Sequence, residues 1–427
     1  MSRSHPTDPL LARDAAVMWH PYTQHALGEP PLPVASAHGA WLNLTDGRRL
    51  LDAVSSWWVN LHGHGHPALV SALSAQAARL EHVLFAGCTH EPAVHLGERL
   101  IALANAGGAN VERVFYSDNG STAVEVALKI AFQAAQQRGE TGRTRFLALH
   151  GAYHGDTFGA MAVGEPEGFH SVFRPLLAPV DFIRPDDLAT LNWTLETRGH
   201  EYAAMIVEPL VQGAAGMRMY SAGFLAEAAR LCRGRGVALI ADEVFTGFGR
   251  TGTMFAFEQA GVSPDLICLS KGLTAGMLPL AATLATRALF ECFQGEGVDR
   301  AFLHGHSFMA NPLACAVANA SLDLLLEPAA IARRAELAEQ TRRHVAALRS
   351  HRGLKNPRSL GLIGAADLRN GTGAYGSSAS RRLRAEAATR GVLLRPLGDV
   401  LYAVPPYCVT DEELATIWRV LGEIAAP

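Results

Sequence analysis

The chain has 427 residues, of which 49% are hydrophobic and 18% charged, so it can bury a large core and favours two domains. Its formal net charge of −3 provides no basic excess of the kind that nucleic-acid binding needs. No apolar run reaches the ~18 residues of a membrane helix, and the first 18 residues contain no signal-peptide hydrophobic stretch. We therefore expect a cytoplasmic protein that binds neither nucleic acid nor membrane.

Lysine is rare in this chain, because only three of the 37 basic residues are lysines, namely Lys129, Lys271 and Lys355. Arginine cannot replace lysine where an amine must lose its proton and act as a nucleophile. Each lysine is therefore a candidate for chemistry, although a plain surface position is the ordinary interpretation for at least two of them. The cysteines form no CxxC pair, which is typical of reduced thiols and not of a disulfide framework or a zinc site. They are Cys88, Cys232, Cys268, Cys292, Cys315 and Cys408.

Five short apolar runs follow one another in the central part of the chain, and each ends in polar or glycine-rich residues. They cover residues 113–117, 145–149, 203–207, 237–241 and 266–269, and a helical pattern from 121 to about 137 follows the first. Continuous apolar strands that alternate with helices predict a parallel sheet covered on both faces. Ligands bind outside the carboxyl ends of such strands, which is where the polar residues fall.

The two flanks of the chain differ from this centre. The first 60 residues are rich in turns and contain a strand-like piece at 40–44. Beyond about residue 330, long helices rich in Ala, Arg, Leu and Glu alternate with strand-like pieces at 391–394 and 400–404. We expect a large central domain over residues 61–325. Residues 1–60 and 326–427 are expected to form a second, smaller domain together.

Two motifs look like ligand sites but are interpreted otherwise. His62, His64 and His66 form an HxHxH pattern, yet the alternating glycines indicate a flexible turn and no carboxylate lies in register nearby. Residues 247–252, GFGRTG, match GxGxxG, but they do not directly follow a strand and no clear amphipathic helix opens after them. We expect neither a metal site nor a dinucleotide site there.

Polar residues after the first two central strands could hold a cofactor. Residues 119–122, Asn-Gly-Ser-Thr, open a helix, so their free N–H groups, a hydroxyl and the helix dipole suit a phosphate. A plain helix cap by Ser121 is the alternative. Tyr153 and His154 follow the next strand, where either ring could stack on a planar cofactor or be an ordinary loop aromatic.

Asp242 and Lys271 follow the last two central strands. A buried carboxylate at Asp242 needs a cationic partner, and a pyridinium nitrogen would be one. A helix cap or a salt bridge to Arg250 is the alternative. An amine at Lys271, at a strand end among apolar residues, would have a lowered pKa, which is the condition for a lysine that forms a Schiff base. Lys129 lies within a helical pattern, and Lys355 lies in a loop-like segment.

Six motifs, in this order, resemble the class-III, fold-type-I aminotransferases that depend on pyridoxal 5′-phosphate (PLP). They are DNGSTAVEVALK (118–129), HGAYHGDTFGAM (150–161), IVEP (206–209), ADEVFTGFGRTG (241–252), LSKG (269–272) and HGHSFMANPLACA (304–316). The resemblance covers nearly the whole chain. It implies an α/β fold with a mainly parallel seven-stranded sheet flanked by helices in the large domain, and a smaller α/β domain from both chain ends.

The resemblance also implies roles at the cofactor. Lys271 would hold PLP as a Schiff base and move the proton, Asp242 would pair with the pyridine nitrogen, and Tyr153 would stack on the ring. A homodimer with shared active sites is implied, because Ser307 of one subunit would reach the phosphate of the other. The residues implied at the phosphate and the adjoining interface loop are Gly120, Ser121, His306 and Ser307.

Three further segments are similar to a subgroup of this family that works in biotin synthesis. They are WHPYTQ (19–24), SSWWVNLHGHGHP (55–67) and GVLLRPLGDVLYAVPPY (391–407). In that subgroup 8-amino-7-oxononanoate accepts the amino group, and S-adenosylmethionine, or lysine in some members, donates it. Aromatic walls suit the aliphatic chain of the acceptor, and a guanidinium at Arg395 suits its carboxylate. The residues implied at the substrate are Tyr22, Trp57, Trp58, Tyr153, Arg250, Gly305 and Arg395.

The chain departs from the family pattern at two places. His306 and Ser307 stand where the family usually has proline and threonine, which puts the rigidity of that loop in question. Asn119 stands where serine is more familiar. Another class-III ω-amino-acid transaminase or a semialdehyde aminomutase remains an alternative. A non-catalytic PLP-binding regulator would need a basic helical appendage that the sequence lacks, and a nicotinamide oxidoreductase would depend on GFGRTG alone.

Overall fold

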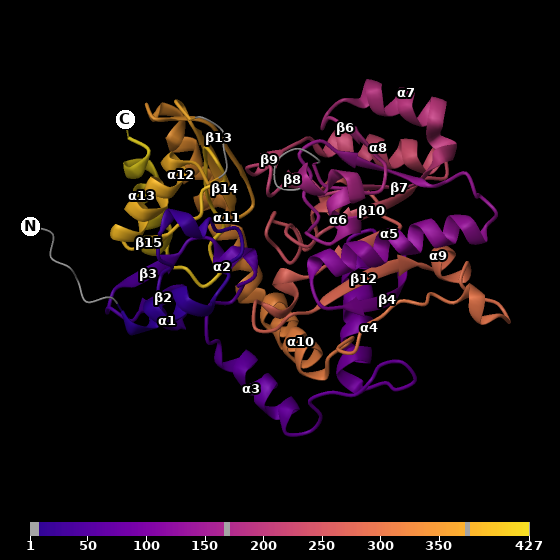
Figure 1. The fold of residues 1–427 in the computed structure, drawn as a ribbon, viewed down its shortest axis with the longest axis horizontal. Coiled ribbons are helices and arrows are strands. Elements are labelled where there is room, and N and C mark those ends of the chain that lie inside the picture. The colour runs from indigo at the N-terminus through magenta and orange to yellow at the C-terminus, as the bar shows by residue number, and fades with distance from the viewer. Residues whose placement is uncertain (1–7, 166–170, 372–375, 427) are drawn as a thin grey trace, which may run out of the picture.

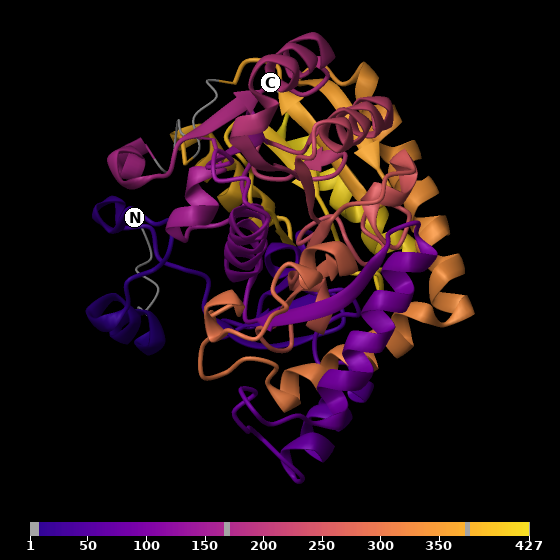
Figure 2. The ribbon, with the colours of Figure 1, turned by 90° about the vertical axis from the view of Figure 1, so that its right-hand side faces the viewer.

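The computed structural model describes residues 8–165, 171–371 and 376–426 of the chain. Its elements form two groups (Figure 1). The central segment, magenta to orange, forms the larger group, and the indigo N-terminal and yellow C-terminal segments lie side by side in the smaller one. The helix α1 (Pro9–Val17) buries none of its residues and extends away from the body of the molecule (Figure 2).

A seven-stranded sheet with the order β4-β12-β11-β10-β7-β5-β6 is the frame of the larger group. The strand β12 runs antiparallel to its neighbours β4 and β11, and the other neighbouring pairs are parallel. This confirms the α/β fold with a mainly parallel sheet. The strands are β4 (Val111–Ser117), β5 (Arg145–Leu149), β6 (Val180–Ile183), β7 (Tyr202–Val207), β10 (Ala238–Asp242), β11 (Leu266–Leu269) and β12 (Ala281–Thr286).

Helices cover both faces of this sheet, as its apolar strands require. In β7, Ala204 and Ile206 pack in a core cluster with the buried face of α5 (Gly120–Gln137), whereas Met205 and Val207 belong to the core on the opposite face. The other helices of the larger group are α3 (Pro67–Ala77), α4 (Glu91–Ala106), α6 (Phe158–Ala162), α7 (Leu188–Arg198), α8 (Ala222–Gly234), α9 (Arg287–Glu291) and α10 (Pro312–Leu326).

The smaller group joins the two ends of the chain within one sheet. The strand β15 (Val392–Leu393) pairs in parallel with β3 (Arg49–Asp52). On its other side β3 pairs antiparallel with β2 (Trp41–Leu44), and β2 pairs antiparallel with β1 (Val34–His38). This sheet supports the layout that the sequence predicts, although the boundaries 1–60, 61–325 and 326–427 stay a prediction. The remaining elements are α2 (Ser55–Trp58), β8 (Val211–Gln212), β9 (Arg218–Met219), α11 (Pro328–Ala347), β13 (Leu354–Leu360), β14 (Ile363–Leu368), α12 (Ser378–Thr389), β16 (Val400–Ala403) and α13 (Asp411–Ile424).

Within the described ranges, no helix is by itself both long and apolar enough to cross a membrane. Two consecutive helical segments, 312–326 and 328–350, are together long and apolar enough, by length and composition alone, and the angle between them is 71°. In this structure α10 is largely buried and packs against α3 and α4.

Candidate active site

Lys271 lies just beyond the carboxyl end of β11, and its Nζ lies 4.5 Å from the ring centroid of Trp58. Desolvation lowers the pKa of this lysine to about 8, and the charge of Arg250 acts in the same direction. The carboxylates of Asp242 and Glu208 oppose that shift. A neutral amine is therefore available at a much lower pH than for an ordinary lysine.

Asp242 ends β10 and is buried beside His154. The Nδ1 of His154 lies 2.6 Å from Oδ2 of Asp242, and the backbone N–H of Val244 donates to Oδ1 at 3.0 Å. The Nε2 of His154 is buried and has no hydrogen-bond partner among the described residues. His154, and not Arg250, is thus the partner of this carboxylate.

The N-terminus of α5 lies at the carboxyl end of β4. The side chain of Asn119 accepts from the N–H of Thr122 at 3.1 Å, so Asn119 and not Ser121 caps the helix. A Cβ at Gly120 would lie 2.7 Å from Cγ1 of Val244, which explains why glycine stands there. The capping leaves the first N–H groups of the helix, at Gly120 and Ser121, for another acceptor.

Tyr153 follows β5 and joins a polar cluster that sequence reasoning missed in part. Its hydroxyl lies 3.1 Å from the hydroxyl of Tyr22 and 3.1 Å from Oδ2 of Asp156, and Tyr22 also donates to Asp156. Burial raises the pKa of Tyr153, and the hydrogen bond with Tyr22 adds to that shift. The N–H of Asp156 donates to Oγ of Ser121 at 3.1 Å, which ties this cluster to the start of α5.

Glu208 is a second residue to which the sequence analysis assigns no role, although it lies directly after β7. Its Oε1 accepts the N–H of Tyr153 at 3.0 Å, and its Oε2 accepts the N–H of Gly213 at 2.9 Å. Burial raises the pKa of Glu208 to about 7, and the negative charge of Asp242 adds to that shift. The buried carboxyl fixes the backbone on which Tyr153 is presented.

Two consecutive tryptophans form a wall across from Lys271. Trp58 meets Phe245 at 4.4 Å between ring centroids and faces the lysine. Trp57 meets Tyr22 at 5.3 Å in an edge-to-face contact, and Cζ of Arg395 lies 4.1 Å from the Trp57 ring centroid. An amine, a tyrosine cluster, aromatic rings and a guanidinium are thus brought together from distant parts of the chain.

Arg250 lies behind this wall. Only 1% of it is exposed, and its guanidinium donates to the carbonyl oxygens of Trp58, Asn60 and Pro405 at 3.3, 2.9 and 2.9 Å. Direct contact between Arg250 and a substrate, which the family resemblance implies, stays a prediction. In this structure the residue supports the backbone of the wall.

The loop of Gly305, His306 and Ser307 is exposed. The Nε2 of His306 lies 4.0 Å from Oδ1 of Asp118, next to the start of α5, and its Nδ1 accepts the N–H of Phe308 at 3.2 Å. The imidazole thus contacts the backbone of its own loop, at the position where the family resemblance leads us to expect proline.

The two other lysines lie elsewhere. The Nζ of Lys129 lies 3.4 Å from His304 Nδ1 on the outside of α5, and Lys355 donates to the carbonyl of Arg369 at 3.3 Å. Lys355 belongs to β13, so its predicted loop-like position is wrong, because the segment pairs with β14. Of the three lysines, only Lys271 lies among the residues of the wall.

The HxHxH segment is an irregular turn whose backbone and side chains have specific partners. The backbone of His64 forms a bridge with Gly39, and the three imidazoles point to different partners. His62 bonds to Ser321, His64 to Asp52, and His66 accepts the N–H of Ala68 at the start of α3. The glycines are there because Gly63 and Gly65 have φ of 92° and 66° and a Cβ at Gly63 would lie 2.6 Å from Sγ of Cys408.

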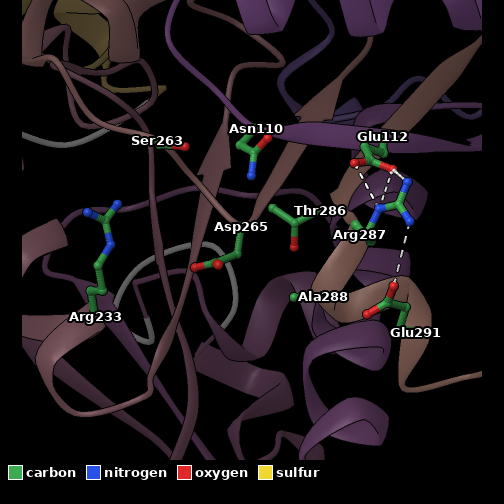
Figure 3. A pocket seen from close by; sticks show the side chains of 9 residues that line it. All are labelled: Asn110, Glu112, Arg233, Ser263, Asp265, Thr286, Arg287, Ala288 and Glu291. Atoms are coloured by element: carbon green, nitrogen blue, oxygen red, sulfur yellow. Dashed lines mark hydrogen bonds and ion pairs between the residues drawn. The ribbon is translucent and has the colours of Figure 1, made fainter.

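A hollow of about 480 Å³ lies at the other end of the strands of the seven-stranded sheet, away from Lys271 (Figure 3). It contains Asp265, which precedes β11, whereas Lys271 follows that strand, so ~13 Å of strand separates the two. Of the two arginines that line it, Arg287 is paired with Glu112 at 2.9 Å and lies 3.8 Å from Glu291. The Lys271 cluster has the more reactive set of groups, and we take it as the candidate active site.

Comparison with known proteins places this site in a family. The model of the class-III aminotransferases matches residues 22–424, and the chain therefore belongs to that family of amino-group-transferring enzymes. The adenosylmethionine-8-amino-7-oxononanoate aminotransferase of Synechococcus elongatus is 47% identical over 420 residues, which are 95% of this chain and 98% of that protein. The enzyme of the same name from Mycobacterium leprae is 40% identical over 97% of this chain and 96% of that protein.

Solved structures agree with this placement. The adenosylmethionine-8-amino-7-oxononanoate aminotransferase of Methanocaldococcus jannaschii aligns with a TM-score of 0.92 and 34% identity, over 97% of this chain and 98% of that one. An amine transaminase from an uncultivated Pseudomonas species, in its PLP-bound form, aligns with a TM-score of 0.89 and 32% identity, over 96% of this chain and 98% of that one.

Proposed function

We propose that this enzyme transfers an amino group to 8-amino-7-oxononanoate, giving 7,8-diaminononanoate for biotin synthesis, with PLP as its cofactor. The observation that carries the proposal is the wall of Trp57 and Trp58, which reaches from Nζ of Lys271 to the guanidinium of Arg395. The relatives that bear the name of this activity match the chain over almost its whole length.

The residues fit PLP at three points. The start of α5, with Gly120 and Ser121, offers N–H groups and a helix dipole to a phosphate. The buried Asp242, oriented by His154, offers a negative charge to a pyridinium nitrogen. Lys271 offers a desolvated amine to the aldehyde.

When bound, PLP supplies an electron sink for the carbon that loses its proton. Once the amine of the donor has displaced it from the aldehyde carbon, the Nζ of Lys271 would accept that proton, because desolvation lowers its pKa to about 8. Asp242 would keep the ring nitrogen of the bound cofactor positively charged. Tyr153 is held in place by Glu208 through its backbone and by Asp156 through its hydroxyl, so it is suited to stack on the ring.

The acceptor suits the rest of the site. An aliphatic chain is expected along Trp57 and Trp58, with its carboxylate at Arg395 and its ketone toward Lys271. The guanidinium of Arg395 lies over the ring of Trp57, so the indole shields one face of the cation from water. The carboxylate of the acceptor would bind the same guanidinium. Tyr22 closes this side through its contact with Trp57.

We further propose a homodimer in which the exposed Ser307 reaches the phosphate of the second subunit. His306, which fixes that loop through the N–H of Phe308, would take over the rigidity that proline gives in other members. S-adenosylmethionine is the proposed donor, because the names of the relatives contain it. Lysine is the alternative donor.

The test is a product assay with PLP-loaded enzyme and 8-amino-7-oxononanoate, with S-adenosylmethionine, lysine or ω-amino acids as separate donors. Formation of diaminononanoate with S-adenosylmethionine supports the proposal, and formation with lysine alone changes the donor. Transfer between ω-amino acids and pyruvate, with no diaminononanoate from any donor, would make the chain a general class-III transaminase.

A further inference from the structure

The helix α2 is a single left-handed turn built without glycine. Its four residues, Ser55, Ser56, Trp57 and Trp58, have φ of 48°, 45°, 69° and 72°. The N–H of Trp58 donates to the carbonyl of Val54 at 2.8 Å, which closes the turn. Side chains with a Cβ rarely adopt this conformation once, and a run of four needs support from the surrounding structure.

The first support is a buried carboxylate. Asp52 is fully buried, and its Oδ2 accepts from Oγ of Ser56 at 2.7 Å while Nε2 of His64 lies 3.1 Å away. Its Oδ1 accepts the N–H of Val54 at 3.2 Å, at the start of the turn. The carboxylate of Asp52 thus holds both the residue before the turn and the second residue of the turn. Losing either contact would leave a buried carboxylate oxygen without a hydrogen-bond partner, which is costly.

The imidazole of His64 approaches from a rigid base outside the turn. The N–H of His64 donates to Gly39 at 2.7 Å, and its carbonyl accepts the N–H of Gly39 at 3.0 Å. The N–H of Asp52 donates to the carbonyl of Ala40 at 2.7 Å, on the same piece of backbone. Histidine and carboxylate are thus tied to one segment, independently of α2.

Two more contacts hold the turn from behind. The hydroxyl of Ser55 donates to the carbonyl of Val404 at 2.7 Å, and Arg250 donates to the carbonyls of Trp58 and Asn60. These contacts reach the end of the turn and its base, but they do not reach Ser56. The conformation of Ser56 therefore depends on Asp52 and His64.

We propose that Asp52, Ser56 and His64 form a positioning network that keeps α2 left-handed, so that Trp57 faces Arg395 and Trp58 faces Lys271. The inference rests on the proposed function, because it assigns these side chains to the wall that receives the acceptor. None of the three touches the reacting atoms. The network acts through the direction in which the two indoles point, since a change of hand at Ser56 would turn both of them.

The first experiment compares His64→Ala with His64→Gln in PLP-loaded enzyme. Gln can still donate to Asp52, whereas Ala leaves the buried carboxylate without that contact. We expect His64→Ala to raise the KM for 8-amino-7-oxononanoate about 10-fold with kcat changed less than about 3-fold, and His64→Gln to recover most of that loss. Equal KM values for wild type and His64→Ala would overturn the inference.

A matched pair at Ser56 separates the backbone from the hydroxyl. Ser56→Ala and Ser56→Gly both lose the bond to Asp52, but glycine adopts positive φ at no steric cost. We expect Ser56→Ala to have a KM about 3-fold or more above that of Ser56→Gly, and Ser56→Gly to reduce the defect of His64→Ala in the double variant. Ser56→Ala performing as well as Ser56→Gly would contradict a role in holding the left-handed turn.

A third readout does not depend on activity. We would record near-ultraviolet circular dichroism of the cofactor-free variants, with Trp57→Phe and Trp58→Phe to identify the contribution of the two indoles, and melting curves to confirm folding. The inference expects His64→Ala and Ser56→Ala to change that contribution and Ser56→Gly to change it less. Unchanged spectra in folded variants would overturn it. If wild type makes no diaminononanoate, the proposed function fails, while the spectra still test the turn.

Discussion

The two sides of the active site are built in different ways. On the cofactor side, Asp242 ends one buried strand, Lys271 lies two residues beyond another, and α5 begins three residues after a third. On the opposite side, Trp57 and Trp58 lie in a left-handed turn that contacts residues far away in the chain, such as Arg250 and Val404. The regular sheet supplies reactive groups by local rules, whereas the substrate wall depends on tertiary support. Changes in the first should abolish chemistry, and changes in the second should alter recognition.

The largest effect is expected on the cofactor side, at Lys271. Lys271→Arg keeps a cation but cannot supply a neutral amine, so we expect kcat to fall by at least about 10³-fold. Lys129→Arg and Lys355→Arg are the matched controls and should retain wild-type turnover. Steady-state kinetics would measure this, and appreciable turnover by Lys271→Arg would contradict the assignment.

The second effect, also on the cofactor side, concerns Asp242. Asp242→Asn preserves the shape but removes the charge beside His154, and we expect kcat to fall about 10²- to 10³-fold, with a smaller change in cofactor affinity. Turnover and PLP titration of the apoprotein measure the two quantities separately. Near-normal turnover would mean that the buried carboxylate only fixes His154.

The third effect belongs to the substrate side and should change binding more than turnover. Arg395→Lys keeps the charge and loses the planar fork, so we expect the KM for 8-amino-7-oxononanoate to rise about 10- to 100-fold with kcat nearly unchanged. Arg230→Lys, on the exposed surface of α8 in a pair with Glu227, is the control. A fall in kcat at constant KM would contradict the assignment of Arg395 to substrate binding.

The smallest effect is a pH dependence of cofactor loading. The pKa of Lys271 is lowered to about 8, so its amine loses its proton as pH rises through that value and becomes nucleophilic above it. We expect the rate at which the apoprotein takes up PLP to rise between pH 6 and 8 and to level off above about 9. A rate that keeps rising toward the pKa of an ordinary lysine would contradict the desolvated position.

The same contrast explains what the sequence could predict. The runs at 145–149 and 266–269 are strands with those bounds, because a continuous apolar run followed by polar residues is a local signal. The sequence analysis does not predict the antiparallel β12, because its small residues and threonines, AATLAT, do not form the run of large apolar residues that indicates the other strands. Polar residues at the ends of strands led to Asp242 and Lys271 for the same local reason.

The missed parts of the site depend on contacts between distant segments. Asp156 acquires its role from Tyr22, which lies 134 positions earlier in the chain. Arg250, which the family resemblance implies at the substrate, also donates to backbone carbonyls of both flanking segments, and no local pattern indicates these contacts. The left-handed turn at Ser55–Trp58 contains no glycine, so its sequence carries no signal of positive φ.

The most direct measurement is to reduce the PLP-loaded enzyme with borohydride, digest it and identify by mass spectrometry which lysine carries the cofactor. The chain offers only Lys129, Lys271 and Lys355, so the outcome is unambiguous. We expect the label on the peptide that contains Lys271 and on neither of the others. A label on Lys129 or Lys355, or no label on any lysine of a PLP-saturated enzyme, would contradict the proposed active site.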